Sequence, residues 1–240
     1  MKKRYILFIM FLFGAQVIMA ASSVKIRQCH GDIQVRQGLD ETWHVAGPGL
    51  ELRTIDTILT GENAWVVLEL EEGLSFKLGP NAMLDIGDLR KITEQELFLY
   101  LTAQKVGRIR PTKEGSIHIE NVSVVRGANQ NQAIVDRNQN EQNARYMLEM
   151  NGARALQQQA YYPNTIIKLY KIKQKFPTSQ QPGEIEFYLG KSFEHVNQVG
   201  RAIDAYQNAL VELEKGEAAS PLSTRIRQEA TEAISRLKAQ

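Results

Sequence analysis

The spacing of apolar residues changes near the middle of this 240-residue chain, and this change constrains the fold more than any other feature. From residue 24 to residue 126, short runs alternate apolar and polar residues, the period of a strand with one buried face. Residues 129–143 are rich in Asn and Gln, and their composition predicts a linker. Residues 144–240 place apolar side chains at helical spacing. The sequence therefore predicts two domains, an all-β domain followed by a helical one.

One hairpin is clear in the first half. Residues 65–70 read WVVLEL and place every second apolar side chain on one face. A Glu-Glu-Gly turn follows, and the run LSFKL at residues 74–78 alternates again, so the two runs predict a hairpin. Residues 97–101 (LFLYL) and 116–125 (SIHIENVSVV) have the composition of further strands. Several short strands at this spacing indicate an all-β sandwich or roll.

The run DTILTGENAWVVLELEEGLSFKLGPNAML, residues 56–84, resembles the FecR-type periplasmic domain, and the resemblance covers residues 22–128. The shared features are the strand pair VKIRQCHGDIQVR, Trp43, Thr60-Gly61, Glu72-Gly73, Pro80-Asn81 and the Val-Arg-Gly segment within 124–128. The chain departs from the family at Ile55-Asp56, where a Gly-Asp is usual, and in the Asn/Gln run that replaces a strand. The resemblance implies a periplasmic sensing or binding domain. The family's control of a sigma factor is not carried over, because we expect no internal membrane helix.

The second half reads as helices with clear boundaries. The first predicted helix runs from residue 144 to residue 158, and Pro163 opens a second one that stops at Phe176-Pro177. A third helix ends near Asn197, and a fourth follows Gly200. Pro221 opens the last helix, whose apolar stripe is Leu222, Ile226, Ala230, Ile234 and Leu237.

This string of helical hairpins resembles the tetratricopeptide repeat. Six residues match the repeat in register: Leu189, Gly190, Phe193, Ala202, Tyr206 and Ala209. The repeat's tryptophan position holds Glu186, and its closing proline is missing. Ile166 and Tyr170 repeat the spacing of Ala202 and Tyr206 in the preceding hairpin. The resemblance implies a short α-hairpin solenoid in which small residues at positions 190 and 202 let two helices pack closely. The last helix is then a cap, or it docks on a second copy.

A partner groove is predicted on the helix that contains Gly190. Its buried stripe is Ile185, Leu189, Phe193 and Val196, at helical spacing. Phe187, Lys191, Glu194 and His195 share another face and match the groove-lining positions of the repeat. Two interpretations of Phe187 are open: an aromatic contact for a partner, or packing against the last helix or a neighbouring hairpin.

The first twenty residues have the order of a secretory signal peptide. Three cations at positions 2–4 precede an apolar run at residues 5–19, and Ala20 and Ala21 follow. The alternative is an uncleaved amino-terminal anchor. Removal of the three leader cations takes the formal net charge from +2 to −1, which argues against a dedicated polyanion binder, and we expect no nucleic-acid partner. The single cysteine, Cys29, excludes an internal disulfide.

No catalytic or metal-binding constellation is predicted. His30, His44 and His118 lack partners at ligand spacing, and the sequence has no G-x-S-x-G elbow. The basic cluster at residues 105–113 is interpreted as a solvated loop, with contact to an acidic envelope polymer as the alternative. We therefore expect neither catalytic residues, nor a metal, nor a cofactor.

The sequence thus predicts a non-enzymatic periplasmic adaptor or scaffold. Its domains would be a signal peptide at 1–20, a β-domain at 22–128, a linker at 129–143 and helical hairpins at 144–240. The β-domain would bind an envelope component, with peptidoglycan or another glycan among the candidates, and the helices would dock a protein partner. The alternatives are a signal-sensing regulator of FecR type, a glycan-binding envelope protein and an enzyme. A flexible linker argues against sensing, because it transmits little force.

Overall fold

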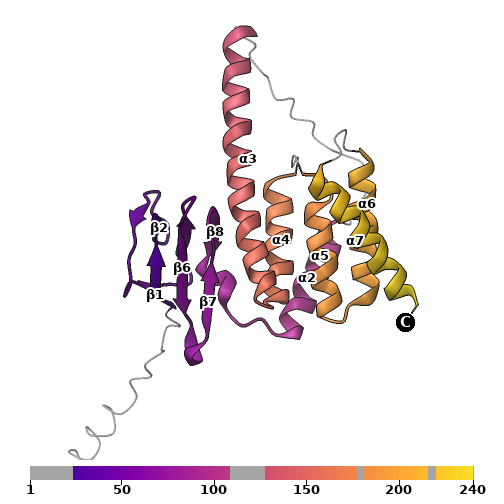
Figure 1. Cartoon of the computed structure of the whole chain (residues 1–240), viewed down its shortest axis with the longest axis horizontal. Coiled ribbons are helices and arrows are strands. Elements are labelled where there is room, and N and C mark those ends of the chain that lie inside the picture. Colours follow the sequence, from indigo (N-terminus) through magenta and orange to yellow (C-terminus); the bar gives the residue numbers. More distant parts are fainter. Residues whose placement is uncertain (1–23, 109–127, 178–180, 216–219, 240) are drawn as a thin grey trace, which may run out of the picture.

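A computed structural model of the protein describes residues 24–108, 128–177, 181–215 and 220–239. A β-sandwich forms the first part of the chain, and helices stand in a row beside it (Figure 1). The order β then α, predicted from the change in apolar spacing, is confirmed. The α-helices within the described residues are α2 Glu94–Arg108, α3 Ala128–Gln158, α4 Tyr162–Lys175, α5 Glu184–His195, α6 Val199–Lys215 and α7 Pro221–Lys238.

The described strands form two antiparallel four-stranded sheets, in the orders β4-β1-β6-β7 and β3-β2-β5-β8. Their inner faces share one apolar core, so the sheets pack as a sandwich. Short 3-10 turns follow β6 and β8, namely η1 Glu71–Gly73 and η2 Ile86–Leu89. The strands are β1 Val24–His30, β2 Ile33–Arg36, β3 His44–Val45, β4 Glu51–Leu52, β5 Thr57–Thr60, β6 Trp65–Glu69, β7 Ser75–Leu78 and β8 Ala82–Asp85.

The predicted hairpin is the pair β6–β7. Val66 lies opposite Leu78 and Leu68 lies opposite Phe76, and all four side chains are fully buried. The residues between them in each strand face outward, as the period of two requires. This part of the sequence prediction is therefore confirmed.

Two polar residues of the sequence motif at residues 56–84 are buried and form hydrogen bonds to turn backbone. The carboxylate of Asp56 accepts hydrogen bonds from the backbone N–H groups of Gly38 (2.9 Å) and Arg53 (2.8 Å). The hydroxyl of Thr60 donates to the carbonyl oxygen of Gly79 (2.6 Å) and accepts from the N–H of Ala82 (3.0 Å). Both side chains are 1% exposed, so these bonds satisfy buried turn backbone. The motif residues therefore have a structural role in the turns.

Residues 97–101, predicted as a strand, lie in α2, so that prediction was wrong. Leu97 and Leu101, one helical turn apart, are buried in the helical core. Phe98 and Leu99 are each 58% exposed. Five consecutive apolar residues fit either a buried strand or a helix, and the length of the run alone does not separate the two.

A capping box that opens α2 was visible in the sequence and would have indicated the helix. The hydroxyl of Thr93 accepts from the backbone N–H of Glu96 (3.2 Å), and the carboxylate of Glu96 accepts from the N–H of Thr93 (3.1 Å). Helix α2 packs with the other helices, so residues 94–108 belong to the helical core, and the last described strand, β8, ends at Asp85. The predicted strand at 116–125 lies outside the described residues.

The Asn/Gln-rich segment 129–143, predicted as a linker, is part of the 31-residue helix α3. Its composition was misleading, because no glycine or proline interrupts the chain between residues 129 and 151. The first half of α3 extends beyond the other helices, and the second half lies between the sandwich and α4 (Figure 1). A continuous helix therefore takes the place of a flexible connection.

The second half of α3 packs directly on β8. The α-carbon of Gly152 lies so close to this strand that a Cβ atom there would overlap the carbonyl oxygen of Met83. One turn later, Ala155 and Leu156 are buried in the core of the sandwich. The contact requires a residue without a side chain at position 152, and it joins the two halves of the protein.

Side-chain amides in α3 and directly after it also cover sheet edges. The side chain of Gln159, just after the helix, accepts from the backbone N–H of Lys77 (2.8 Å) and donates to its carbonyl oxygen (2.8 Å). In the same way Asn151 donates to the carbonyl oxygen of Asn81 (2.6 Å). These bonds satisfy edge groups of β7 and of the turn before β8 that would otherwise be open to another strand.

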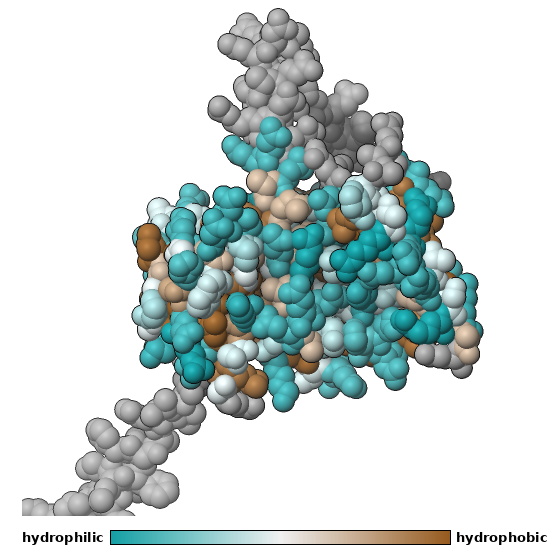
Figure 2. Space-filling model, in the orientation of Figure 1, coloured by the Kyte–Doolittle hydropathy of each residue, from teal (hydrophilic) through white to brown (hydrophobic). Residues whose placement is uncertain are grey.

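The four helices α4 to α7 pack in sequence order. The predicted starts at Pro163 and Pro221 agree with α4 and α7, and Ser220 caps α7 through a hydrogen bond from the N–H of Ser223 (3.0 Å). The surface over the helices is mostly hydrophilic on the face drawn in Figure 2. Among the described helices, none is both long enough and apolar enough to span a bilayer.

Candidate functional site

Helix α5 carries all four residues predicted to line a partner groove. Its stripe of Ile185, Leu189 and Phe193 is buried in the helical core, as the sequence predicted, and Val196 is partly buried just after the helix. These residues face α4 and α6, the neighbours with which α5 makes its most extensive contacts. The packing of the stripe therefore fixes which side of α5 turns toward α7.

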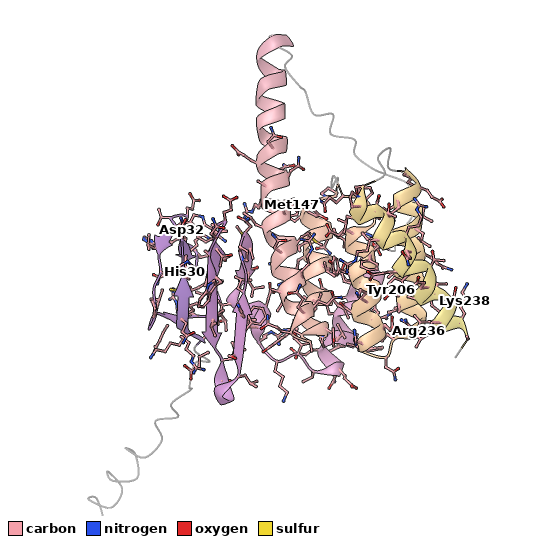
Figure 3. The ribbon with its side chains drawn as sticks, viewed as in Figure 1. His30, Asp32, Met147, Tyr206, Arg236 and Lys238 are labelled. Carbon is pink, nitrogen blue, oxygen red and sulfur yellow. The ribbon has the colours of Figure 1, made fainter. Side chains whose placement is uncertain are left out.

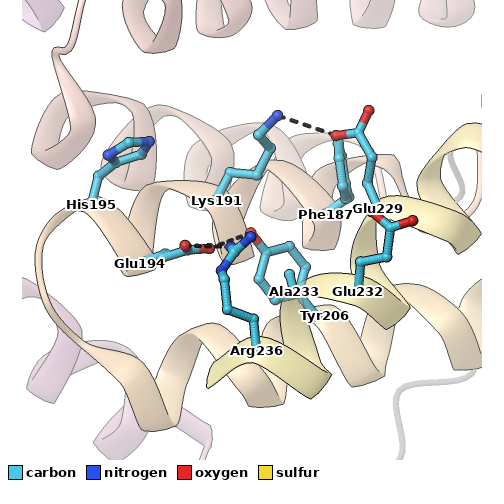
Figure 4. Close-up of a pocket in the computed structure, with 9 residues that line it drawn as sticks. All are labelled: Phe187, Lys191, Glu194, His195, Tyr206, Glu229, Glu232, Ala233 and Arg236. Carbon is cyan, nitrogen blue, oxygen red and sulfur yellow. Dashed lines mark hydrogen bonds and ion pairs between the residues drawn. The ribbon is translucent and has the colours of Figure 1, made fainter. Parts of the chain in front are cut away.

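A hollow of about 220 Å³ lies between α5 and α7 (Figure 4). It brings the four predicted residues together with side chains from α6 and α7. Its lining consists of Phe187, Lys191, Glu194, His195, Tyr206, Glu229, Glu232, Ala233 and Arg236. Tyr206, predicted only as a packing residue, and Arg236 lie within the helical part in Figure 3.

The charged groups of the hollow pair with one another across the two helices. The ammonium of Lys191 lies 3.3 Å from Glu229, and the guanidinium of Arg236 lies 2.5 Å from Glu194 (Figure 4). The hydroxyl of Tyr206 donates to the other oxygen of Glu194 (3.1 Å). The wall of the hollow is thus a set of partly exposed ion pairs. A charged ligand could replace one partner of a pair, and the released partner would be solvated by water.

Two pKa shifts describe the state of this network. Burial and the negative charge of Glu194 raise the pKa of Tyr206. A hydrogen bond from Arg225 lowers the pKa of Glu229, and Lys191 adds to this effect while partial burial opposes it. At neutral pH Tyr206 is therefore a hydrogen-bond donor and Glu229 is a carboxylate.

Phe187 packs within the helical part, which favours the second interpretation of this residue, and only a small part of its side chain reaches the hollow. The side chain is buried, with 3% exposed. Its ring lies 6.1 Å from that of Tyr206, and the ammonium of Lys191 lies 5.3 Å above it. Helix α7 docks beside α5 and covers this face, which the alternative interpretation anticipated. Phe187 forms part of the apolar floor of the hollow.

The residues of α7 that line the hollow were missed in the sequence. Glu229, Glu232 and Arg236 flank the apolar stripe of α7, one or two positions away from its members. That stripe was recognised, and a helical wheel places its flanks beside the neighbouring helix. The sequence does not show which helix lies beside α7. The packing of the helices determines this neighbour.

His195 lies at the exposed rim of the hollow. Its ring stacks on that of Tyr162, the first residue of α4, with the ring centroids 4.0 Å apart and the planes 5° from parallel. The stack on Tyr162 fixes the position of the His195 ring, a contact that the sequence did not indicate.

The small residue at position 190 leaves room for Tyr206 of the facing helix α6. A Cβ atom on Gly190 would lie 2.6 Å from Cδ1 and 2.7 Å from Cε1 of Tyr206. Gly190 therefore makes room for an aromatic ring of α6, which packs over the helix backbone. Ala202 is itself fully buried in the same helix pair.

We expect Gly190→Leu to lower the free energy of unfolding by about 2 kcal/mol, the usual range for overpacking a core. Helix propensity alone favours the change by about 1 kcal/mol, so a loss must come from the overlap with Tyr206. Chemical denaturation measures the difference. In a Tyr206→Ala background the same substitution should lose much less, and an equal loss in both backgrounds would contradict this explanation.

A buried lysine joins the two halves of the protein. Lys168 of α4 is 1% exposed, and its ammonium lies 3.2 Å from Asp85 at the end of β8 and 3.2 Å from Asp88 of η2. Glu149 of α3 lies 3.6 Å from the same nitrogen. Neither the lysine nor its carboxylates were singled out in the sequence, because they come from four separate elements.

The lysine remains charged in this setting. Burial alone would lower the pKa of Lys168, but the charges of Asp88, Asp85 and Glu149 outweigh it and raise that pKa. Burial opposes ionisation of Asp85 too, yet Lys168 and a hydrogen bond from Thr57 lower the pKa of this carboxyl. A charged, paired ammonium is a poor nucleophile. We therefore interpret the cluster around Lys168 as an electrostatic connection between the sheet and the helices.

The described part of the chain contains no group of three His, Cys, Asp or Glu side chains close enough to share a metal ion. Cys29 is free and partly buried in β1. The sequence candidates His118 and most of the basic cluster 105–113 lie outside the described residues. Comparisons of the chain with protein-family models, with curated proteins and with solved structures found no match.

Proposed function

We propose that this protein is an exported, non-enzymatic adaptor of the cell envelope. In this proposal the sandwich is a FecR-type domain that binds an envelope component, and α3 to α7 are tetratricopeptide-like hairpins that dock a protein partner. One observation carries the proposal. Four residues selected from the sequence as groove-lining surround a single hollow, together with three charged residues of α7.

The hollow suits a segment of a protein better than a small molecule. Its volume of about 220 Å³ is below the roughly 300–1,000 Å³ of small-ligand pockets, and it has room for one or two side chains. Phe187 and Ala233 offer an apolar floor, and the pairs Lys191–Glu229 and Arg236–Glu194 offer both charges. A partner segment with an apolar anchor between charged residues would match this arrangement.

A second candidate function is signal sensing of the FecR type, and α3 is the observation that favours it. The segment expected to be a flexible linker is helical, and the same helix contacts β8 and α4. The argument that a linker transmits little force therefore no longer applies. A ligand on the sandwich could act on the array through α3.

The docking proposal is tested by photo-crosslinking in cells. A photoreactive amino acid at position 191, at the hollow, should give one discrete adduct with a partner protein. The matched control is position 211, where Val211 is 47% exposed on α6 and lies outside the hollow. We expect no such adduct there, and fractionation of the same cells should place the protein in the envelope. Identical adducts from both positions, or none from position 191, would contradict docking at this site.

A further inference from the structure

The outer face of the sheet β4-β1-β6-β7 carries a strip that combines an aromatic ring with cations. His30 lies opposite Trp65, and Val67 lies between Gln28 and Lys77 in the strand register. The neighbouring residues of each strand are buried in the core, so the side chains of the strip point away from it. His30 lies in the sandwich, on the side remote from α7 (Figure 3).

Trp65 is the centre of this strip. It is partly exposed, its ring stacks on that of His30 at a centroid distance of 6.2 Å, and the ammonium of Lys77 lies 5.5 Å from its centroid. The register of β1 shifts between Ile26 and Gln28, so Arg27 is the extra residue of a bulge. Bulges commonly redirect a side chain at a binding surface, and Arg27 is exposed here.

The strip has an excess of positive charge at one end. In the strand register Lys25 lies beside Glu51 on one side and Glu69 on the other, so acidic residues flank it. At the other end, within the described residues, neither Arg27 nor Lys77 forms an ion pair with a carboxylate. The strip therefore complements an anionic ligand.

We propose that Arg27, Gln28, His30, Trp65 and Lys77 bind the glycan strands of peptidoglycan. The apolar face of a sugar ring would pack on the indole, and the side-chain amide of Gln28 would bind an acetamido group. Arg27 and Lys77 would bind carboxylates of the stem peptides. Arg27 lies on β1 and Lys77 on β7, with β6 between them, and this separation suits a chain with separate carboxylates better than a single phosphorylated headgroup. The inference rests on the proposed envelope location and names the component that the β-domain binds.

The test uses the purified full chain and insoluble peptidoglycan in a sedimentation assay. We expect Trp65→Ala to weaken binding at least tenfold and Arg27→Ala to weaken it severalfold. The matched control is Trp43→Ala, because Trp43 also has a cation over its ring, Arg36 at 5.4 Å, but lies beside the other sheet. That variant should bind within twofold of the unaltered chain. Circular dichroism confirms that each variant is folded.

A second readout reports on the site itself. The chain has two tryptophans, so Trp43→Phe leaves Trp65 as the only indole, and its emission should shift when soluble disaccharide-peptide fragments are added. Absence of binding, equal losses in the two alanine variants, or binding to lipopolysaccharide alone would each overturn the proposal. Because these components are purified, failure here leaves the crosslinking result at the hollow unaffected, and the two proposals can fail separately.

Discussion

Gly152→Ala is expected to lower the free energy of unfolding by about 3 kcal/mol, although alanine is the better helix former by about 1 kcal/mol. The methyl group would overlap the carbonyl oxygen of Met83, which belongs to the backbone of β8 and cannot rotate away. Either α3 must leave the sheet or the strand must shift. Both responses expose Ala155 and Leu156, which are buried in the sandwich core. Denaturant unfolding of the purified chain measures the loss.

The chain offers a matched control at Gly200. This glycine also lies in a helix, near the start of α6, and a Cβ atom there would meet nothing within 4 Å. We therefore expect Gly200→Ala to be neutral or to stabilise the protein by up to about 1 kcal/mol. If glycine-to-alanine substitution destabilises the protein at position 152 but not at position 200, the loss at position 152 comes from the contact with β8. A neutral result at position 152 would contradict the close packing of α3 on the sheet.

Lys168→Met is expected to lower the free energy of unfolding by about 3 kcal/mol at pH 7. Methionine fills much of the same space, but it leaves Asp88 and Glu149, both about 5% exposed, without their shared counter-charge. Removing one partner of a buried ion pair usually costs about 3–5 kcal/mol. Lys171 and Lys175 still contact these carboxylates, so the lower end of that range applies. The control is Lys171→Met, since Lys171 is half exposed and its loss should cost under about 1 kcal/mol.

The loss of unfolding free energy in the Lys168→Met variant should become smaller as the pH falls. The pKa of Asp85 is lowered in the folded protein, so its contribution is present above the unfolded value of about 3.9 and is lost as the pH falls below it. The variant lacks this contribution. Its difference from the unaltered chain should therefore shrink between pH 7 and pH 3. A difference that stays constant over this range would show that the loss comes from packing and not from charge.

Alternation and turn residues predicted most of the sandwich, because apolar and polar residues alternate along a strand that has one buried face. Val66, Leu68, Phe76 and Leu78 illustrate this, since each was placed on the inner face and each is fully buried. The prediction failed for residues 97–101, where a continuous apolar run has no period. It failed again for residues 129–143, where the polar composition was taken as evidence for a linker. These residues continue helix α3, whose second half packs on the sheet and stabilises the helix.

The groove residues were predicted from the resemblance to a helical repeat, because in such a repeat each helix face has a fixed orientation. Lys191, Glu194 and His195 accordingly lie at the hollow. Phe187 was placed correctly on its face, but its burial depends on α7, whose position the sequence did not specify. The cluster around Lys168 was beyond prediction, because its members are brought together only when α3 and α4 dock on the end of β8. Contacts between distant elements leave no periodic signal.

The central claim is that sandwich and helices form one body, joined by α3 and by Lys168. Both tryptophans, Trp43 and Trp65, lie in the β part, so their fluorescence reports on the sandwich, whereas circular dichroism at 222 nm reports mainly on the helices. Unfolding the full chain in urea with both probes tests the claim most directly. We predict transitions with the same midpoint, as a single cooperative unit requires. Two separate midpoints would show that the halves unfold independently and would contradict the claim.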